Sequence, residues 1–161
     1  MGLFSFTQEI AIDLGTANIV IAVVDAENRP VAGISTASKV VRDGIVVDYI
    51  GAVRALTRMK AELEAKLGCT LDRAATAIPP GIMDGNVRCI CNVVEGAGFE
   101  VSNVVDEPTA AATVLGIDAG AVVDVGGGTT GVGSITAGDL VSIFSQENIY
   151  TTLTPEEQTT R

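Results

Sequence analysis

The most informative stretch of the sequence is residues 122–132, VVDVGGGTTGV. An apolar run with one acid, Asp124, leads directly into three glycines and two threonines. Three consecutive glycines cost conformational entropy, so a strand that ends in them needs a reason for their presence. One interpretation is a hairpin turn. The other is a backbone that a ligand approaches closely, most of all a phosphate.

An earlier stretch repeats this pattern. Residues 10–25, IAIDLGTANIVIAVVD, again place a single acid, Asp13, on an apolar run that ends in Gly and Thr. A carboxylate on a buried strand is costly unless something pairs with it. Two such hairpins side by side would form an anion cradle flanked by carboxylates, and a hard cation such as Mg²⁺ would have to separate those carboxylates from a phosphate. The alternative is that both acids cap turns, but the repetition favours the phosphate-and-metal interpretation.

Composition limits the class of protein. The chain has 161 residues, is 47% hydrophobic and carries a formal net charge of −10. Its size and apolar content predict one globular domain with a core of its own. The negative charge argues against nucleic acid and against an anionic membrane as partners, because both require basic patches. No apolar run reaches transmembrane length and no signal peptide is visible, so a cytoplasmic location is expected.

Histidine and cysteine usage excludes several chemistries. The chain contains no His, which rules out Ser-His-Asp and Cys-His catalysis and every His-ligated metal site. Its three cysteines are Cys69, Cys89 and Cys91. Their odd number and the single residue between the last two favour small packing residues over a metal or redox site.

Apolar periodicity predicts the order β-β-β-α-β-α-β-α-β-β, a mixed sheet with helices. Helices are expected over residues 49–67, 83–97 and 107–115. Strands are expected over residues 8–14, 17–25, 29–37, 72–78, 100–105, 121–126 and 131–145. Asp48 and Gly68 fit the N-cap and the C′ position of the first helix.

This order resembles the first lobe of the actin, Hsp70 and sugar-kinase superfamily. Three motifs carry the resemblance: residues 10–25, residues 105–112 (VDEPTAAA) and residues 122–135 (VVDVGGGTTGVGSI). It implies an α/β, ribonuclease H-like fold with a mixed five-stranded sheet and helices. Residues 40–53 (VVRDGIVVDYIGAV) and 74–81 (AATAIPPG) resemble more narrowly a family of chaperone-like proteins encoded with the ethanolamine-utilisation enzymes, whose pathway uses a bacterial microcompartment.

The resemblance implies ATP and Mg²⁺ as cofactors. Asp13 and Asp124 would hold the metal, and Glu107 would orient the attacking water, so these three residues form the implied catalytic set. From the residues alone, the alternative for Glu107 is stabilisation of a helix N-terminus beside Pro108. The phosphate-binding residues implied are Gly15, Thr16, Ala17, Asn18, Gly126, Gly127, Gly128, Thr129 and Thr130.

The chain also departs from the superfamily pattern. Hsp70 takes a catalytic lysine from an outer subdomain, and Lys39, the lysine nearest that place in the sequence, is not assigned the role. Residues 1–146 are expected to form an ATPase lobe, and the polar residues 147–161 to begin a second one. We therefore expect this chain alone to be inactive as an ATPase and to self-associate through a bared apolar face.

Three functions are compatible with the sequence. The first is a nucleotide-dependent, chaperone-like protein that assists ethanolamine-utilisation enzymes or microcompartment proteins, in the cytoplasm or at the microcompartment. The second is a binding or assembly module that keeps the fold without hydrolysing ATP. The third, a small-molecule kinase, is least favoured because no substrate-binding segment is visible and EPTAAA is typical of the chaperones.

Overall fold

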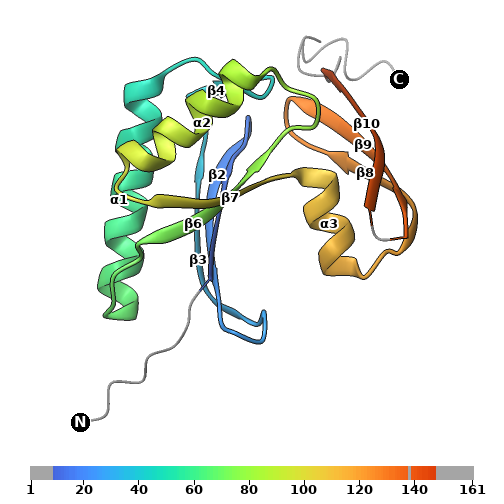
Figure 1. The fold of residues 1–161 in the computed structure, drawn as a ribbon. Helices are drawn as coiled ribbons and strands as arrows, with labels where there is room; N and C mark the ends of the chain where they lie inside the picture. Colours follow the sequence, from blue (N-terminus) through green and yellow to red (C-terminus); the bar gives the residue numbers. More distant parts are fainter. Residues whose placement is uncertain (1–8, 138, 148–161) are drawn as a thin grey trace, which may run out of the picture.

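The computed structural model describes residues 9–137 and 139–147, with side chains for residues 9–137. Its first sheet has the strand order β3-β2-β1-β6-β7 (Figure 1). The strands β1 (Glu9–Leu14), β2 (Asn18–Val24) and β3 (Pro30–Ala37) pair antiparallel, whereas β6 (Arg73–Ile78) and β7 (Glu100–Asp106) run parallel to β1. The predicted mixed five-stranded sheet is therefore confirmed.

Helices α1 (Tyr49–Leu67) and α2 (Asp84–Gly96) cover one face of this sheet (Figure 1). Apolar residues at helical spacing turn one side of α1 into the core: Ala52, Leu56, Met59 and Leu63. Both predicted caps of α1 are present. The Asp48 carboxylate accepts a hydrogen bond of 2.9 Å from the Gly51 N–H, and Gly68 ends the helix with a φ of 70°.

The last three strands form a separate antiparallel sheet in the order β10-β9-β8. These strands are β8 (Ala119–Val125), β9 (Thr129–Thr136) and β10 (Asp139–Glu147). Helix α3 (Glu107–Leu115) packs Ala112 against Val122 and Ile135 of this sheet, away from α1 and α2 (Figure 1). The sequence did not indicate this second sheet, because the hydrophobic pattern of a strand does not specify which other strand it pairs with.

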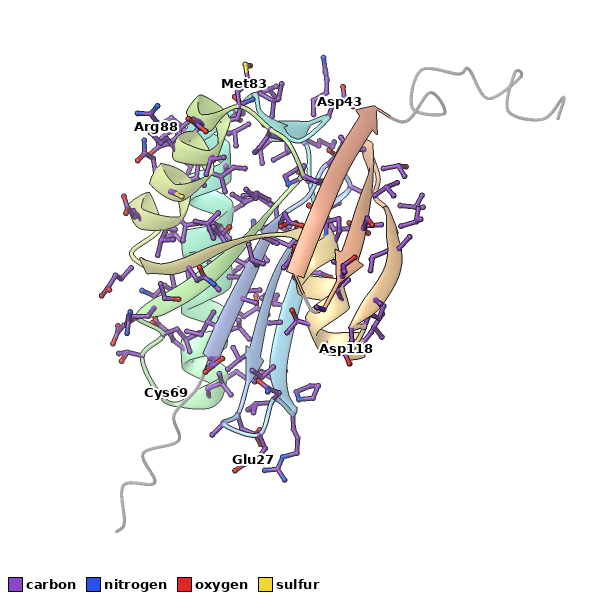
Figure 2. The ribbon with its side chains drawn as sticks, turned by 45° about the vertical axis from the view of Figure 1, so that its right-hand side comes forward. Glu27, Asp43, Cys69, Met83, Arg88 and Asp118 are labelled. Carbon is purple, nitrogen blue, oxygen red and sulfur yellow. The ribbon has the colours of Figure 1, made fainter. Side chains whose placement is uncertain are left out.

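A short hairpin, β4 (Val41–Arg42) and β5 (Ile45–Val46), was not predicted. Its two turn residues both have positive φ, 49° at Asp43 and 76° at Gly44. This conformation matches the turn chemistry of an Asp-Gly pair between apolar residues. Figure 2 shows Asp43 at the opposite end of the molecule from Glu27, which lies in the turn between β2 and β3.

No helix in the ranges just given combines the length and the apolar character needed to cross a membrane. The three cysteines have intermediate burial, and Cys69 packs against the core. On α2 the buried residues are Ile90, Val93 and Val94.

Candidate functional site

A cavity of about 230 Å³ lies where the turn between β1 and β2 meets the turn between β8 and β9. We call residues 15–17 the first turn and residues 126–128 the second turn. Thr130, which pairs with Val125 across the β8–β9 hairpin, lies outside the lining. The other predicted site residues all line the cavity: Asp13, Gly15, Thr16, Ala17, Asn18, Glu107, Asp124, Gly126, Gly127, Gly128 and Thr129.

Strand alternation explains why the carboxylates face this cavity. Successive side chains on a strand point to opposite faces. On β1, Ile12 and Leu14 are buried in the core, so Asp13 between them projects to the other face and is half-buried. On β8, Val122 is buried and Asp124 follows two residues later on the same face. Glu107 is the first residue of α3, directly after the last residue of β7.

The two turns pack directly against each other. A Cβ built on Gly127 would lie 2.5 Å from the Cβ of Ala17, and one built on Gly128 would lie 2.6 Å from Oγ1 of Thr16. None of the three glycines in the second turn has a positive φ. The hairpin interpretation is confirmed, since the Gly126 N–H donates to the Thr129 carbonyl at 2.9 Å. The close approach of the two turns, not a left-handed backbone, nevertheless requires glycine at 127 and 128, whereas a Cβ on Gly126 would meet the Thr129 carbonyl of its own hairpin at 3.0 Å.

Several backbone donors at the turns have no partner. Within residues 9–137 and 139–147, the N–H groups of Thr16, Ala17, Gly127 and Gly128 donate no hydrogen bond. Successive free N–H groups in a turn form a concave site for anions. The pair of turns therefore offers what a phosphate requires.

Three carboxylates gather at the same cavity without a cation. Asp13, Glu107 and Asp124 line it, and its lining contains no Lys or Arg, Lys39 included. Burial raises the pKa of Asp13, and the charge of Asp124 raises that pKa further. Burial is also the largest cause that raises the pKa of Glu107 to about 8, followed by the charges of Asp13 and Asp124. A hydrogen bond to Asp124 raises the pKa further, so at neutral pH Glu107 keeps its proton and donates a hydrogen bond to the Asp124 carboxylate.

These residues fit a hydrated cation better than a bare one. In the part of the chain that the structure describes, no three Asp, Glu, Cys or His groups are close enough to ligate a metal directly. Mg²⁺ keeps several of its waters and binds through one or two carboxylates together with substrate phosphates. In this cavity Mg²⁺ would relieve the repulsion among the carboxylates. A phosphate would accept hydrogen bonds from the free N–H groups.

Four residues of the lining were not among the predicted site residues, namely Leu14, Val20, Gly44 and Pro79. The Gly44 N–H, at the tip of the β4–β5 hairpin, donates to Oγ1 of Thr16 at 3.4 Å. A Cβ on Gly44 would lie 2.9 Å from Cγ of Pro79, which follows the last residue of β6. The Asp-Gly pair predicts a tight turn, but nothing local to it predicts contact with a residue 28 positions earlier.

Comparisons with known proteins agree with this geometry. The chain is 48% identical over 129 residues to the ethanolamine utilization protein EutJ of Salmonella typhimurium, and 46% identical over the same length to EutJ of Escherichia coli. Each match covers 80% of this chain but only 45% of the relative. The chain therefore spans less than half the length of these curated relatives.

Solved structures give the same result at the level of the fold. The crystal structure of EutJ from Carboxydothermus hydrogenoformans matches with a TM-score of 0.82 and 44% identity, over 94% of this chain and 60% of that one. MreB5 of Spiroplasma citri bound to ADP matches with a TM-score of 0.65 and 22% identity, over 87% of this chain and 52% of that one. The second likeness is one of fold alone.

A family model described as MreB/Mbl protein matches residues 29–147, which include β3, α3 and the second turn. This match covers more than two thirds of the chain. The chain therefore belongs to the MreB/Mbl protein family and has the actin-like fold.

Proposed function

We propose that this chain binds ATP with Mg²⁺ between its two turns, as an actin-like, chaperone-like protein of ethanolamine utilisation. One observation carries the proposal. Two turns from distant parts of the sequence, each preceded by a carboxylate, meet at one cavity with free N–H donors and no cation of their own.

The residues would divide the work as follows. The free N–H groups of both turns would bind the phosphates, as backbone donors do in other anion sites. Asp13 and Asp124 would hold the water shell of Mg²⁺. The ion would neutralise the negative charges of the carboxylates and of the phosphates. Phosphoryl transfer requires positioning and electrostatic stabilisation more than covalent chemistry from the protein. Backbone donors and two carboxylates held by strands are suited to both.

Glu107 would orient the attacking water once its proton has left. Its pKa of about 8 keeps it protonated at neutral pH as long as no cation balances the negative charges of Asp13 and Asp124. A cation near those two carboxylates would remove much of the repulsion that holds the proton on Glu107. Metal binding would therefore convert Glu107 from a donor to Asp124 into an acceptor for water.

The cellular part of the proposal rests on the EutJ relatives. We place the protein in the cytoplasm or at a bacterial microcompartment, where its partners would be ethanolamine-utilisation enzymes or shell proteins. Self-association is a second kind of contact that the surface supports, because Val123 is 59% and Val125 73% exposed on β8. Sedimentation of the chain and of a Val123→Lys, Val125→Lys variant would test it, with the variant expected to stay monomeric.

A non-hydrolysing binding module is the second candidate function. The lack of any Lys or Arg in the lining favours it, because transferring phosphoryl groups are commonly stabilised by such cations. A chain that binds nucleotide but does not turn it over would still change its partners in response to nucleotide.

Calorimetric titration with Mg²⁺-ATP tests the binding proposal. We expect Asp13→Asn and Asp124→Asn to lower the affinity for Mg²⁺-ATP more than the affinity for ATP in EDTA. The matched control is Asp118→Asn, an exposed acid just before β8 that lies outside the cavity (Figure 2). No heat of binding with the parent, or equal losses in all three variants, would refute the assignment.

Phosphate release then separates the two candidate functions. Turnover that Glu107→Gln abolishes would establish an ATPase, and binding without turnover would establish the non-hydrolysing module. Transfer of phosphate to an added small acceptor would instead support the kinase. Retention of ethanolamine-utilisation enzymes on the immobilised chain, with nucleotide present and absent, tests the chaperone-like role.

A further inference from the structure

Gly131 lies in β9, next to β8 and α3, which carry Asp124 and Glu107, and next to the segment that follows β6. It is buried, and it is the cross-strand partner of Asp124 in the β8–β9 ladder. A Cβ built on Gly131 would lie 2.7 Å from Cγ of Pro80, 3.1 Å from its Cδ and 3.4 Å from Cγ of Pro108. The backbone of β9 therefore rests on two proline rings.

Each proline lies in or beside an element that helps to position another carboxylate of the cavity. Pro80 comes two residues after β6, which pairs in parallel with β1, so that Ala77 is opposite Asp13. Pro80 is less than 2% exposed. Pro108 directly follows Glu107 in the first turn of α3 and is also buried. Proline rings have fixed φ and few rotamers, so neither support yields easily.

The glycine is not explained by its backbone conformation. The φ of Gly131 is not in the left-handed region, and the residue lies within a regular strand, where glycine is otherwise unfavourable. The close approach of another backbone or a ring is the remaining structural reason for glycine inside a strand. Here that neighbour is Pro80.

We propose that Gly131 is a positioning residue, which fixes Asp124 relative to Asp13 and Glu107 by seating β9 on Pro80 and Pro108. The inference rests on the proposed function for its consequence, since these are the carboxylates assigned to Mg²⁺ and water. It goes beyond that function because Gly131 itself lies outside the lining of the cavity.

The first test needs no ligand. Carboxyl ¹³C resonances of Asp13, Glu107 and Asp124 are recorded at one fixed pH for the parent, Gly131→Ala and Gly85→Ala. Gly85→Ala is the matched control, because a Cβ on Gly85 meets nothing within 4 Å. We expect Gly131→Ala to move the Asp124 and Glu107 resonances and Gly85→Ala to leave them in place.

Rescue tests the cause of the shift. The double variant Gly131→Ala, Pro80→Ala lacks the two ring atoms that a new Cβ would meet at 2.7 and 3.1 Å. We expect it to return the resonances toward the parent, and to recover most of an about tenfold loss in Mg²⁺-ATP affinity (about 1.4 kcal/mol) that Gly131→Ala causes. Pro80→Ala alone removes one of the two rings that contact Gly131 and should move the same resonances. This variant therefore tests the inference even if Gly131→Ala fails to fold.

Two results would overturn the inference. One is a Gly131→Ala variant that melts at a lower temperature while the carboxyl resonances stay in place, since Gly131 would then only pack. The other is a Pro80→Ala variant with unmoved resonances. A parent that binds no Mg²⁺-ATP would refute the proposed function instead, and the unliganded resonances would still decide the role of Gly131.

Discussion

Gly127 and Ala17 meet where the two turns touch, and their contact links the glycine run to the rest of the site. The hypothetical Cβ of Gly127 would come within 2.5 Å of the Ala17 Cβ, 3.1 Å of its nitrogen and 3.3 Å of its Cα. Real carbon atoms do not approach so closely. A side chain at 127 would therefore push the second turn away from the first and widen the anion site.

We expect Gly127→Ala to lower the free energy of unfolding by about 1–3 kcal/mol, as overpacking of a tight contact does. Adding Ala17→Gly should recover part of this loss, because the Cβ–Cβ contact disappears while the backbone contacts remain. Urea denaturation of the single and double variants measures both. Gly85→Ala, in open space on α2, should be neutral or stabilising by up to about 1 kcal/mol. Equal effects of Gly127→Ala and Gly85→Ala would contradict the contact.

Glu107 makes stability depend on pH. Its pKa rises from 4.5 to about 8 on folding, so the folded chain binds more protons than the unfolded chain between those values. The stability contributed by the shift is fully present below pH 4.5 and is lost as the pH rises through about 8. The raised pKa of Asp13 acts in the same direction.

Replacing this carboxyl should remove much of the pH dependence. We expect Glu107→Gln to gain stability relative to the parent as the pH rises from 4.5 to 8, measured as the difference between urea midpoints across that range. Glu62→Gln, on an exposed site of α1 outside the cavity, is the matched control. Parallel curves for parent and Glu107→Gln would show that Glu107 titrates normally.

The sequence predicted most of the cavity's residues because the site is a repeat. Asp13 and Asp124 each precede a turn with Gly and Thr, so two short motifs were sufficient to name both halves. Gly44 and Pro79 also belong to the lining, through contacts with residues far along the chain. No local pattern carries such contacts, and the raised pKa of Glu107 likewise depends on neighbours that only folding brings together.

At the level of elements, two helices begin with the same cap. The carboxylate of Asp48 accepts from Gly51 in α1, and that of Asp106 accepts from Thr109 in α3, each at 2.9 Å. Removal of such a cap costs about 1 kcal/mol in most helices. Only the second cap lies beside a residue of the cavity, namely Glu107.

This pair provides a matched test of α3. Asp106→Ala and Asp48→Ala should lower the free energy of unfolding by a similar amount, about 1 kcal/mol each. Only Asp106→Ala should also weaken binding of Mg²⁺-ATP, because fraying of α3 displaces Glu107 and Pro108. Urea denaturation and calorimetry on the same preparations measure the two effects. Equal losses of affinity in both variants would mean that the cavity responds to global stability and not to α3.

Element prediction succeeded where periodicity is long and failed where it is short. Nineteen residues with apolar spacing of three and four, and a cap at each end, identified α1. The two-residue strands of the β4–β5 hairpin are too short for any period to appear, although Asp43 and Gly44 carried a turn signal. The separation of β8, β9 and β10 into a second sheet depends on pairing partners, which strand patterns do not encode.

The whole molecule carries an excess of negative charge, and this excess is most concentrated at the cavity. The chain carries a formal net charge of −10, and three of its carboxylates meet without a cation in the lining of one cavity. Salt screens exposed charges over about 8–10 Å at ordinary ionic strength, so any salt should relieve part of the general repulsion. A partly buried cluster is screened much less and responds to a cation that enters it.

Magnesium should therefore stabilise the chain beyond what ionic strength explains. At matched ionic strength, we expect MgCl₂ to raise the melting temperature of the parent more than NaCl does, with an added stability of about 1.4 kcal/mol when Mg²⁺ is at ten times its Kd. In a variant with Asp13→Asn and Asp124→Asn, the two salts should have equal effects. The extra increment in the parent should also grow as the pH rises toward 8, because Mg²⁺ competes with the proton that Glu107 retains. A Mg²⁺ increment that survives in the double variant, or that is constant with pH, would place the ion elsewhere on the acidic surface.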